Sequence, residues 1–423
     1  MRTRIDMAKR PARPCLPSRN ARSCSDRCRV IVRLQIRDPR LSGRTKPRAS
    51  RNGRVSRMQI PAMRWWLAAA SLPAVLAFRW LAFQAPEVTE RFYAGATYPV
   101  VARVVGSLSR WFPVPLAEIG LVGLLVVGFV VLRRWWYAQL PTTRARRLGR
   151  LALLAWTGIA LGLGVFLLAW GLNYARPPLR DRLVLDLGGI RDAEVLALGE
   201  RLVHATNAAY SELGADPEAP TALPLGIAEV DQLVDAAYRR LALPGDAIDF
   251  ATAPAKSLLS SSVFSRLGIS GIFIPFTGEP LFNGAIPEVS KPVAIAHEKA
   301  HQRGITDEGE ANLAAVLACL ESGDPYLRYS ALLYSSATLV GAASRYDPVG
   351  ASEAASLWAE GPRADLVARQ EFWARYQGVA TRAASRVNDA YLRSNRVQGG
   401  VQSYGRVASM LVGLDRSGEL PVQ

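Results

Sequence analysis

Three long apolar runs dominate the first 175 residues of the chain. They cover residues 65–83, 116–132 and 151–172. Each approaches the ~20 residues that a helix needs to cross a membrane. Aromatic side chains, which favour the membrane–water interface, flank the second run at both ends: Trp111, Phe112, Trp135, Trp136 and Tyr137. The pattern predicts a membrane domain over residues 58–175 that contains three transmembrane helices.

Basic residues set the expected orientation of these helices. Six arginines lie beside or between the second and third runs: Arg133, Arg134, Arg144, Arg146, Arg147 and Arg150. Short loops rich in Lys and Arg stay in the cytoplasm. We therefore expect a multi-pass protein of the cytoplasmic membrane. Its N-terminus would be cytoplasmic, and the residues after the third run would lie outside the cytoplasm.

Residues 176–423 are predicted to form a mainly helical domain. Apolar residues recur at helical spacing over residues 190–213 and 228–243. Residues 257–288 differ, because two short β-rich runs with Gly and Pro between them predict a hairpin. Pro275 restricts the first strand to a sheet edge or ends it. An edge strand here could pair with an extended peptide, although a purely structural hairpin has the same pattern.

The N-terminal segment, residues 1–57, accounts for most of the charge. It holds 18 Lys and Arg against three Asp, so it carries +15 of the net charge of +17. It is either a basic disordered tail or a mis-called start, since Met58 and Met63 directly precede the first apolar run. The segment has no aromatic residues to stack on bases, so we do not expect nucleic acid as a partner. Outside it, Cys319 is the single cysteine, which excludes a disulfide framework.

His297-Glu298-Lys-Ala-His301 is the clearest chemical motif in the chain. On a helix, positions i and i+4 share one face, so His297 and His301 can bind one metal ion, with Zn²⁺ the expected cofactor. Glu298 would act as the general base toward the water that the metal activates. The third histidine of the chain, His204, has no His or Cys three or four residues away and is expected to be an ordinary helix residue.

A catalytic zinc site needs a third protein ligand, and three acidic residues follow the motif. Glu308 is our first choice, because Glu308-Gly-Glu-Ala-Asn312 resembles the Glu-x-x-Ala-Asp of membrane gluzincin peptidases, with Asn312 in place of the final Asp. Asp307 is an alternative by its spacing from the motif, as in metzincin-like enzymes. Glu310 is another, either as a ligand or as the partner of a histidine N–H.

The surroundings of the motif suggest further roles. Gly304 is expected to end the metal-binding helix, and Thr306 to cap the next one. Tyr391 or Tyr404 could donate a hydrogen bond to the oxyanion that develops during hydrolysis.

At this point the chain resembles an uncharacterised bacterial membrane family, domain of unknown function 3810 (DUF3810), over roughly residues 65–415. The resemblance rests on five segments: WGLNYARPPL (170–179), GISGIFIPFTG (268–278), IAHEKAHQ (295–302), DEGEAN (307–312) and VQSYGR (401–406). It implies three membrane helices joined to a zinc-peptidase-like domain. It also implies functional roles for His297, Glu298, His301 and the acidic cluster.

Together these features predict a mainly α protein with three transmembrane helices and a mostly helical, zincin-like extracytoplasmic domain over residues 176–423, with a small β-hairpin or edge strand. The expected function is that of a membrane-anchored zinc metallopeptidase that hydrolyses peptide or protein substrates. The alternative is a non-catalytic membrane protein with a structural or sensing metal site in envelope assembly. The pattern specifies neither the substrate nor the oligomeric state.

Overall fold

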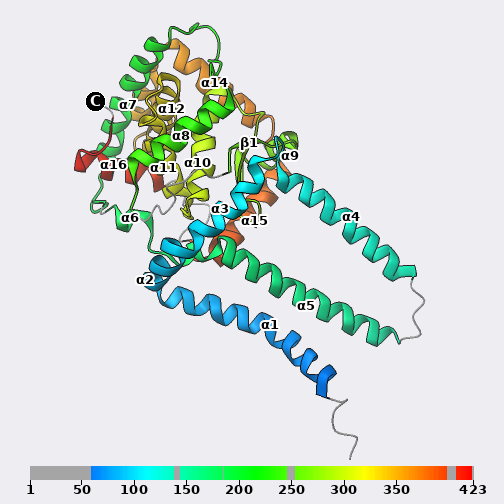
Figure 1. The fold of residues 1–423 in the computed structure, drawn as a ribbon. Coiled ribbons are helices and arrows are strands. Elements are labelled where there is room, and N and C mark those ends of the chain that lie inside the picture. The colour runs from blue at the N-terminus through cyan, green and yellow to red at the C-terminus, as the bar shows by residue number, and fades with distance from the viewer. Residues whose placement is uncertain (1–58, 138–142, 184, 245–252, 398–405, 422–423) are drawn as a thin grey trace, which may run out of the picture. The chain divides into compact units, whose positions relative to one another are not determined.

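The computed structural model describes residues 59–137, 143–183, 185–244, 253–397 and 406–421. The predictions for residues 1–57 and for Tyr404 lie outside this part of the chain. The described residues are mainly α-helical, with one small sheet, as predicted (Figure 1).

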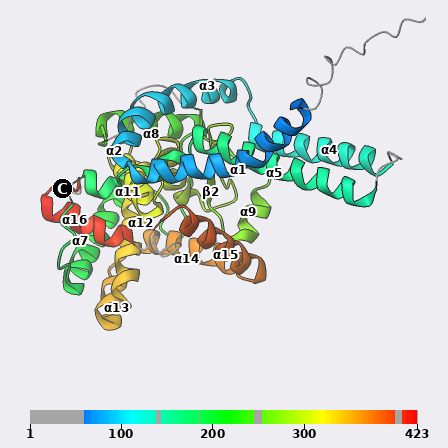
Figure 2. The same cartoon turned by 90° about the horizontal axis from the view of Figure 1, so that it is seen from below.

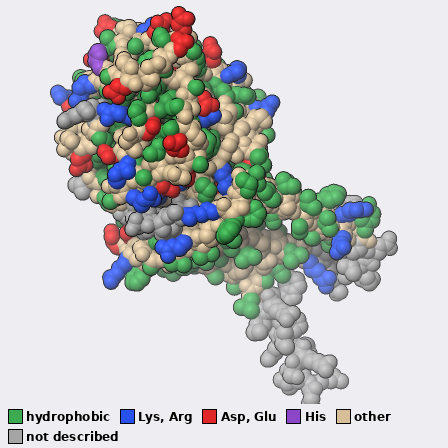
Figure 3. Space-filling view, turned by 45° about the horizontal axis from the view of Figure 1, so that its top comes forward, with side chains coloured by type: hydrophobic (Ala, Val, Ile, Leu, Met, Phe, Trp, Pro, Cys, Tyr) green, Lys and Arg blue, Asp and Glu red, His purple; other side chains and the backbone are tan. Residues whose placement is uncertain are grey.

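Three helices are long and apolar enough to cross a membrane: α1 (Gln59–Gln84), α4 (Leu116–Tyr137) and α5 (Arg144–Ala169). They coincide with the three predicted runs, except that the third run was predicted to extend to Leu172. The helix ends earlier because Trp170 leaves the helical conformation, and the next residues form the 3₁₀ segment η2 (Gly171–Ala175). Apolar side chains cover the long helices, whereas charged groups are interspersed over the rest of the visible face (Figure 3).

The segment between the first two long helices is also helical. It consists of α2 (Pro86–Val88), the π-helical segment η1 (Thr89–Thr97) and α3 (Tyr98–Arg110). One face of α3 exposes Val100, Val104 and Leu108, which recur every four residues. The opposite face is buried against the domain, where the Tyr98 hydroxyl donates a hydrogen bond of 2.6 Å to the Gln302 carbonyl.

The rest of the described chain forms a helical domain. Its helices are α6 (Leu179–Arg182), α7 (Asp192–Leu213), α8 (Ile227–Leu241), α9 (Ser261–Leu267), η3 (Glu288–Ser290), α10 (Lys291–Gln302), α11 (Glu308–Leu320), α12 (Pro325–Ala343), α13 (Pro348–Ser356), α14 (Glu360–Ala374), α15 (Val379–Ser394) and α16 (Val407–Ser417). The helix with the His-Glu-x-x-His motif, α10, packs against α8, α11 and α12 inside this domain (Figure 1), and Figure 2 shows the same domain from below. Nearly every residue of α10 is buried, so the core holds the motif rigidly.

A three-stranded sheet packs against α10. Its strands are β1 (Lys256–Ser257), β2 (Gly271–Ile274) and β3 (Glu279–Phe282), in the order β1-β3-β2. Strands β2 and β3 form the predicted hairpin, with Gly271 opposite Phe282 and Ile274 opposite Glu279. β2 ends directly before Pro275 and lies at the sheet edge, as the proline indicated.

A buried ion pair joins this sheet to the second long helix. Glu279 of β3 lies 2.7 Å from Lys256 Nζ. The same carboxylate accepts hydrogen bonds from the backbone N–H groups of Leu116 and Ala117, at the start of α4. These N–H groups have no partner inside the helix, so Glu279 satisfies them and complements the helix dipole.

Candidate metal centre

Both histidines of the motif point from α10 to the same place. Because they lie four residues apart on the helix, their Nε2 atoms come within 3.1 Å of each other. Gly304 follows the last turn with a positive φ of 83°, so the helix ends where predicted. A Cβ at Gly304 would lie 2.7 Å from both Arg176 Nη1 and Asn173 Oδ1, so a larger residue does not fit this turn.

The turn returns the chain so that α11 begins beside the histidines. Glu308 is the first residue of α11, and its Oε2 lies 3.2 Å from His297 Nε2 and 3.4 Å from His301 Nε2. The possible ligand atoms of the three side chains all lie within 4.8 Å of one another. Glu308 is therefore the acid of the predicted cluster that reaches the two histidines.

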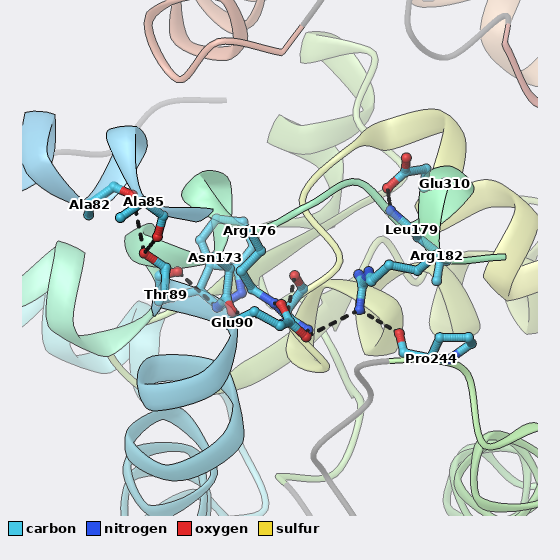
Figure 4. Close-up of polar contacts among 12 residues, drawn as sticks. Ala82, Ala85, Thr89, Glu90, Asn173, Arg176, Leu179, Arg182, Pro244 and Glu310 are labelled. Carbon is cyan, nitrogen blue, oxygen red and sulfur yellow. Dashed lines mark hydrogen bonds and ion pairs between the residues drawn. The ribbon is translucent and has the colours of Figure 1, made fainter. Parts of the chain in front are cut away.

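The other two candidate acids have structural roles. Asp307 is the N-cap of α11, because its side chain accepts hydrogen bonds from the backbone N–H groups of Gly309 and Glu310. The expectation that Thr306 caps this helix was therefore wrong. Glu310 accepts hydrogen bonds from the backbone of Leu179, at 2.8 Å, and of Arg180, so it does not hold a histidine N–H (Figure 4).

Two other acceptors orient the imidazole rings. His297 Nδ1 lies 2.9 Å from Asn312 Oδ1, and His301 Nδ1 lies 2.7 Å from the Ile305 carbonyl oxygen. A carbonyl oxygen only accepts, so Nδ1 of each ring carries a proton, and Nε2 is the nitrogen that faces Glu308 and can bind a metal ion. In the sequence, Asn312 stood out only as a departure from the Glu-x-x-Ala-Asp pattern. Nothing in the sequence indicated that the Ile305 carbonyl would accept a hydrogen bond from His301.

Glu298 lies beside the two histidines and is almost fully buried. Its Oε2 is one of the few buried side-chain oxygens in the described residues without a hydrogen-bond partner. The Phe273 backbone of edge strand β2 forms a hydrogen bond to this carboxylate. A Cβ at Gly271 would lie only 2.5 Å from Glu298 Oε1, so the strand passes this closely only because residue 271 is a glycine.

The charges at the centre are strongly coupled. Burial raises the pKa of Glu298 to about 7, Glu308 adds to this effect, and the two histidines oppose it. Burial disfavours a charged His301, but Glu308 and Glu298 outweigh it and raise the pKa of His301 to about 9. Burial also disfavours a charged Glu308, yet His301 and His297 hold its pKa far below the ordinary value. The carboxylates thus favour a positive charge between the rings, which either a proton or a divalent cation supplies.

Aromatic residues next to the third long helix cover one side of the centre. The Trp170 ring lies 6.2 Å from the His301 ring, and its Nε1 donates a hydrogen bond of 2.7 Å to the His301 carbonyl. Tyr174 packs edge-on against Trp170, and its hydroxyl lies 3.3 Å from that of Tyr391. Burial raises the pKa of Tyr391, so its hydroxyl stays protonated and able to donate. Tyr391, one of the two predicted tyrosines, thus belongs to the aromatic cluster beside the centre.

A buried network of charges supports the opposite side of α10. Lys299 Nζ lies 2.7 Å from Asp231 and 3.0 Å from Asp235, both on α8. Arg303, one turn further along α10, lies 3.0 Å from Asp235. Two cations thus meet two anions, which fixes α10 against α8. No local pattern indicated this pairing, because the partners Lys299 and Asp231, and likewise Arg303 and Asp235, are 68 residues apart.

No curated protein and no solved structure matches the chain. A family model described as "Protein of unknown function (DUF3810)" matches residues 93–412, a somewhat shorter stretch than the sequence motifs indicated. The match extends from η1 into α16 and includes every residue of the candidate centre. The chain belongs to the DUF3810 family.

Proposed function

We propose that this protein is a membrane-anchored zinc metallopeptidase. The observation that carries the proposal is the convergence of His297 Nε2, His301 Nε2 and a Glu308 oxygen, with the unpartnered carboxylate oxygen of Glu298 beside them. Two imidazoles and a carboxylate form the donor set of many catalytic zinc sites. The orienting contacts at both Nδ1 atoms, which fix the rings, support the same assignment.

The chain's own residues supply the other requirements of peptide hydrolysis. A bound zinc ion would polarise the scissile carbonyl and activate water for attack. Glu298 would take the proton from the attacking water and deliver it to the leaving amine. Tyr391, with its protonated hydroxyl, would donate a hydrogen bond to the developing oxyanion.

Strand β2 would position the substrate. It is an edge strand, and it lies against Glu298 through Gly271 and Phe273. An extended peptide that pairs with a free strand edge gains main-chain hydrogen bonds that do not depend on its sequence. This pairing would place a peptide bond next to the general base.

The proposal includes the location of the protein. The three apolar helices would span the bacterial cytoplasmic membrane, and the arginines at the C-terminal end of α4 and the N-terminal end of α5 would remain in the cytoplasm. The centre lies beside Trp170, at the opposite end of α5, so it would be on the extracytoplasmic side.

Metal content tests the proposal most directly. We expect about one zinc per chain in the purified protein, as a three-ligand site predicts. Zinc should be lost in His297→Ala and Glu308→Ala but retained in Glu310→Ala, because Glu310 faces the backbone of Leu179. Absence of zinc from wild-type protein prepared with the metal would refute the proposal.

Glu298→Gln separates catalysis from metal binding. This variant keeps the size and burial of the side chain but removes the base, so it should retain zinc and lose peptide hydrolysis. If it retained both zinc and the cellular function of the protein, the metal site would be structural or sensory rather than catalytic.

A further inference from the structure

We infer that the centre acts on polypeptides held in the membrane and cuts them within a few residues of the membrane boundary. This inference rests on the proposed peptidase function and adds a substrate class to it. It depends on where the centre lies relative to the ends of the apolar helices and on the course of strand β2.

The end of α5 lies beside the metal centre. The apolar part of α5, Leu148–Ala169, has 22 residues. At about 1.5 Å per residue it is ~33 Å long and matches the ~30 Å hydrocarbon core, so Ala169 marks the boundary. Trp170 is the next residue, and its ring lies 6.2 Å from the His301 ring. The polar interface on each side of a bilayer is roughly 5–7 Å thick, so the centre lies at the level of the headgroups.

Two other contacts join the helical domain to residues just inside the ends of the apolar helices. Phe276, in the β2–β3 turn, packs at 6.5 Å against the ring of Phe166, which precedes the end of α5 by almost one turn. Arg79, inside the apolar part of α1, donates a hydrogen bond of 2.5 Å to the Ser394 carbonyl at the end of α15. The β2–β3 turn and the end of α15 therefore touch the membrane boundary from the domain side.

Helix α3 provides an independent indication of the same boundary. It runs across the direction of the long helices, between the end of α1 and the start of α4, in Figure 1. Its exposed stripe of Val100, Val104 and Leu108 continues into Trp111, which is also exposed. A transverse helix with one apolar face and a terminal Trp is suited to lie in the membrane interface.

Strand β2 connects this boundary to the general base. Gly271 contacts Glu298, Phe273 packs at 5.7 Å against Trp170, and Phe276 reaches Phe166. The strand therefore runs from the centre toward the membrane. A strand advances about 3.3 Å per residue, so an extended substrate beside β2 would cover this distance with about three to six residues. A polypeptide that leaves the membrane here would present its first peptide bonds to Glu298.

Cleavage of anchored and free peptides tests this inference. The full chain, loaded with zinc, is reconstituted in lipid nanodiscs with one test peptide in two forms, with and without an apolar span of about 20 residues. Gly-Ser spacers of increasing length separate the span from the test segment, with the span before the segment in one series and after it in another. We expect the anchored form to be cleaved at least tenfold faster. The cut should stay at about three to six residues from the span when the spacer is lengthened.

The contrary results are distinguishable. Equal cleavage of the free and anchored peptides, or a cut that stays at one sequence whatever the spacer, would overturn the inference and leave the peptidase proposal intact. If neither peptide were cleaved by the zinc-loaded wild type, the peptidase proposal and with it the substrate class would fail. Glu298→Gln is the control for contaminating peptidases.

A depth measurement tests the placement of the centre without relying on activity. Phe276→Cys and Val349→Cys are made with Cys15, Cys24 and Cys28 replaced by Ser, and each is labelled with a fluorophore. Both positions are exposed, at 56% and 69%, but Val349 lies on α13, which packs on α7 and α12. Brominated lipids should quench the label at residue 276 and not the label at residue 349. Equal, weak quenching at both positions would overturn the inference.

Discussion

At the scale of single residues, the hydrogen bonds at Nδ1 of His297 and His301 fix how each imidazole presents its Nε2 atom to the centre. His301 donates to a backbone carbonyl, which accepts only, whereas His297 depends on the side chain of Asn312. A backbone acceptor cannot be removed by substitution. A substitution of Asn312 therefore tests how the orientation of the His297 ring affects metal binding, and it leaves His297 itself unchanged.

Asn312→Leu should lower zinc affinity about 10- to 100-fold, because His297 loses the acceptor that fixes its ring and tautomer. Asn312→Asp keeps an acceptor oxygen at the same place and should bind zinc at least as tightly as the wild type. Competition with a chromophoric chelator measures both affinities. Equal affinity of the Leu variant and the wild type would show that the contact does not orient the ligand.

Gly271→Ala should damage catalysis and spare the metal. The new Cβ would lie 2.5 Å from Glu298 Oε1, so the carboxylate or the strand must move by a large fraction of an ångström. Misplacement of a catalytic group by about 1 Å can cost roughly 100-fold in rate. Peptide hydrolysis should fall to that extent, while zinc content stays at the wild-type level because neither histidine is touched.

Gly341→Ala on α12 is the matched control. A Cβ at this position meets nothing within 4 Å, so Ala fits without displacement. In a helix, Ala is more stable than Gly by about 0.5–1 kcal/mol, so this variant should unfold slightly later and keep full activity. If both glycine variants hydrolysed peptide at the wild-type rate, Glu298 would not depend on the space that Gly271 leaves.

At the scale of elements, the sequence predicted what local patterns specify. The three apolar runs, the motif helix and the hairpin each depend on periodicity or turn residues within about 30 positions, and the structure shows all of them. Helix α3 was not predicted, because its short apolar stripe lies between two much longer apolar runs. The early end of α5 at Trp170 was missed for a related reason, since apolar composition continues past the last helical turn.

The candidate metal centre was predictable in part. His297 and His301 lie on one helix, so their spacing alone brings them together. Whether Glu308 or Asp307 faces the histidines depends on whether Thr306 or Asp307 caps α11, and the sequence allows both caps. Because Asp307 occupies the cap, the next residue begins the helix and faces the histidines. Trp170 and Gly271 come from distant segments, and only the packing of the whole chain places them at the centre.

The connection of β3 to α4 predicts a dependence on pH. Burial opposes ionisation of Glu279, but Lys256 and the backbone N–H groups of Leu116 and Ala117 outweigh it and lower its pKa. A lowered pKa in the folded state means that this carboxylate stabilises the protein fully above its ordinary pKa of 4.5, and that the contribution is lost as pH falls below that value. Thermal unfolding of the wild type should therefore shift to lower temperature below about pH 4.5.

Glu279→Gln should remove much of that shift and destabilise the protein at neutral pH. It breaks a buried pair and leaves Lys256 without its carboxylate, a change that typically costs about 3–5 kcal/mol. Glu288→Gln is the control, since Glu288 forms a more exposed ion pair with Lys291 worth at most about 1 kcal/mol. Thermal scans from pH 3 to 8 compare the three proteins, and identical pH profiles for wild type and Glu279→Gln would contradict the assignment.

At the scale of the whole molecule, the membrane helices and the helical domain share one set of contacts. Trp170 holds the end of α10, Tyr98 binds its last carbonyl, and Glu279 caps α4. The centre is therefore fixed by residues that also fix the ends of the membrane helices. The side of the membrane on which those ends lie decides which substrates the centre can meet.

The arginines at the C-terminal end of α4 and the N-terminal end of α5 predict that side. Charged guanidinium groups are retained in the cytoplasm, so the other ends of α4 and α5, together with the metal centre, should face outward. Alkaline phosphatase, which folds only outside the cytoplasm because it needs disulfides, should be active when fused to the C-terminus. A fluorescent protein that matures only in the cytoplasm should stay dark at the same position. Bright fluorescence without phosphatase activity would invert the topology and place the substrates in the cytoplasm.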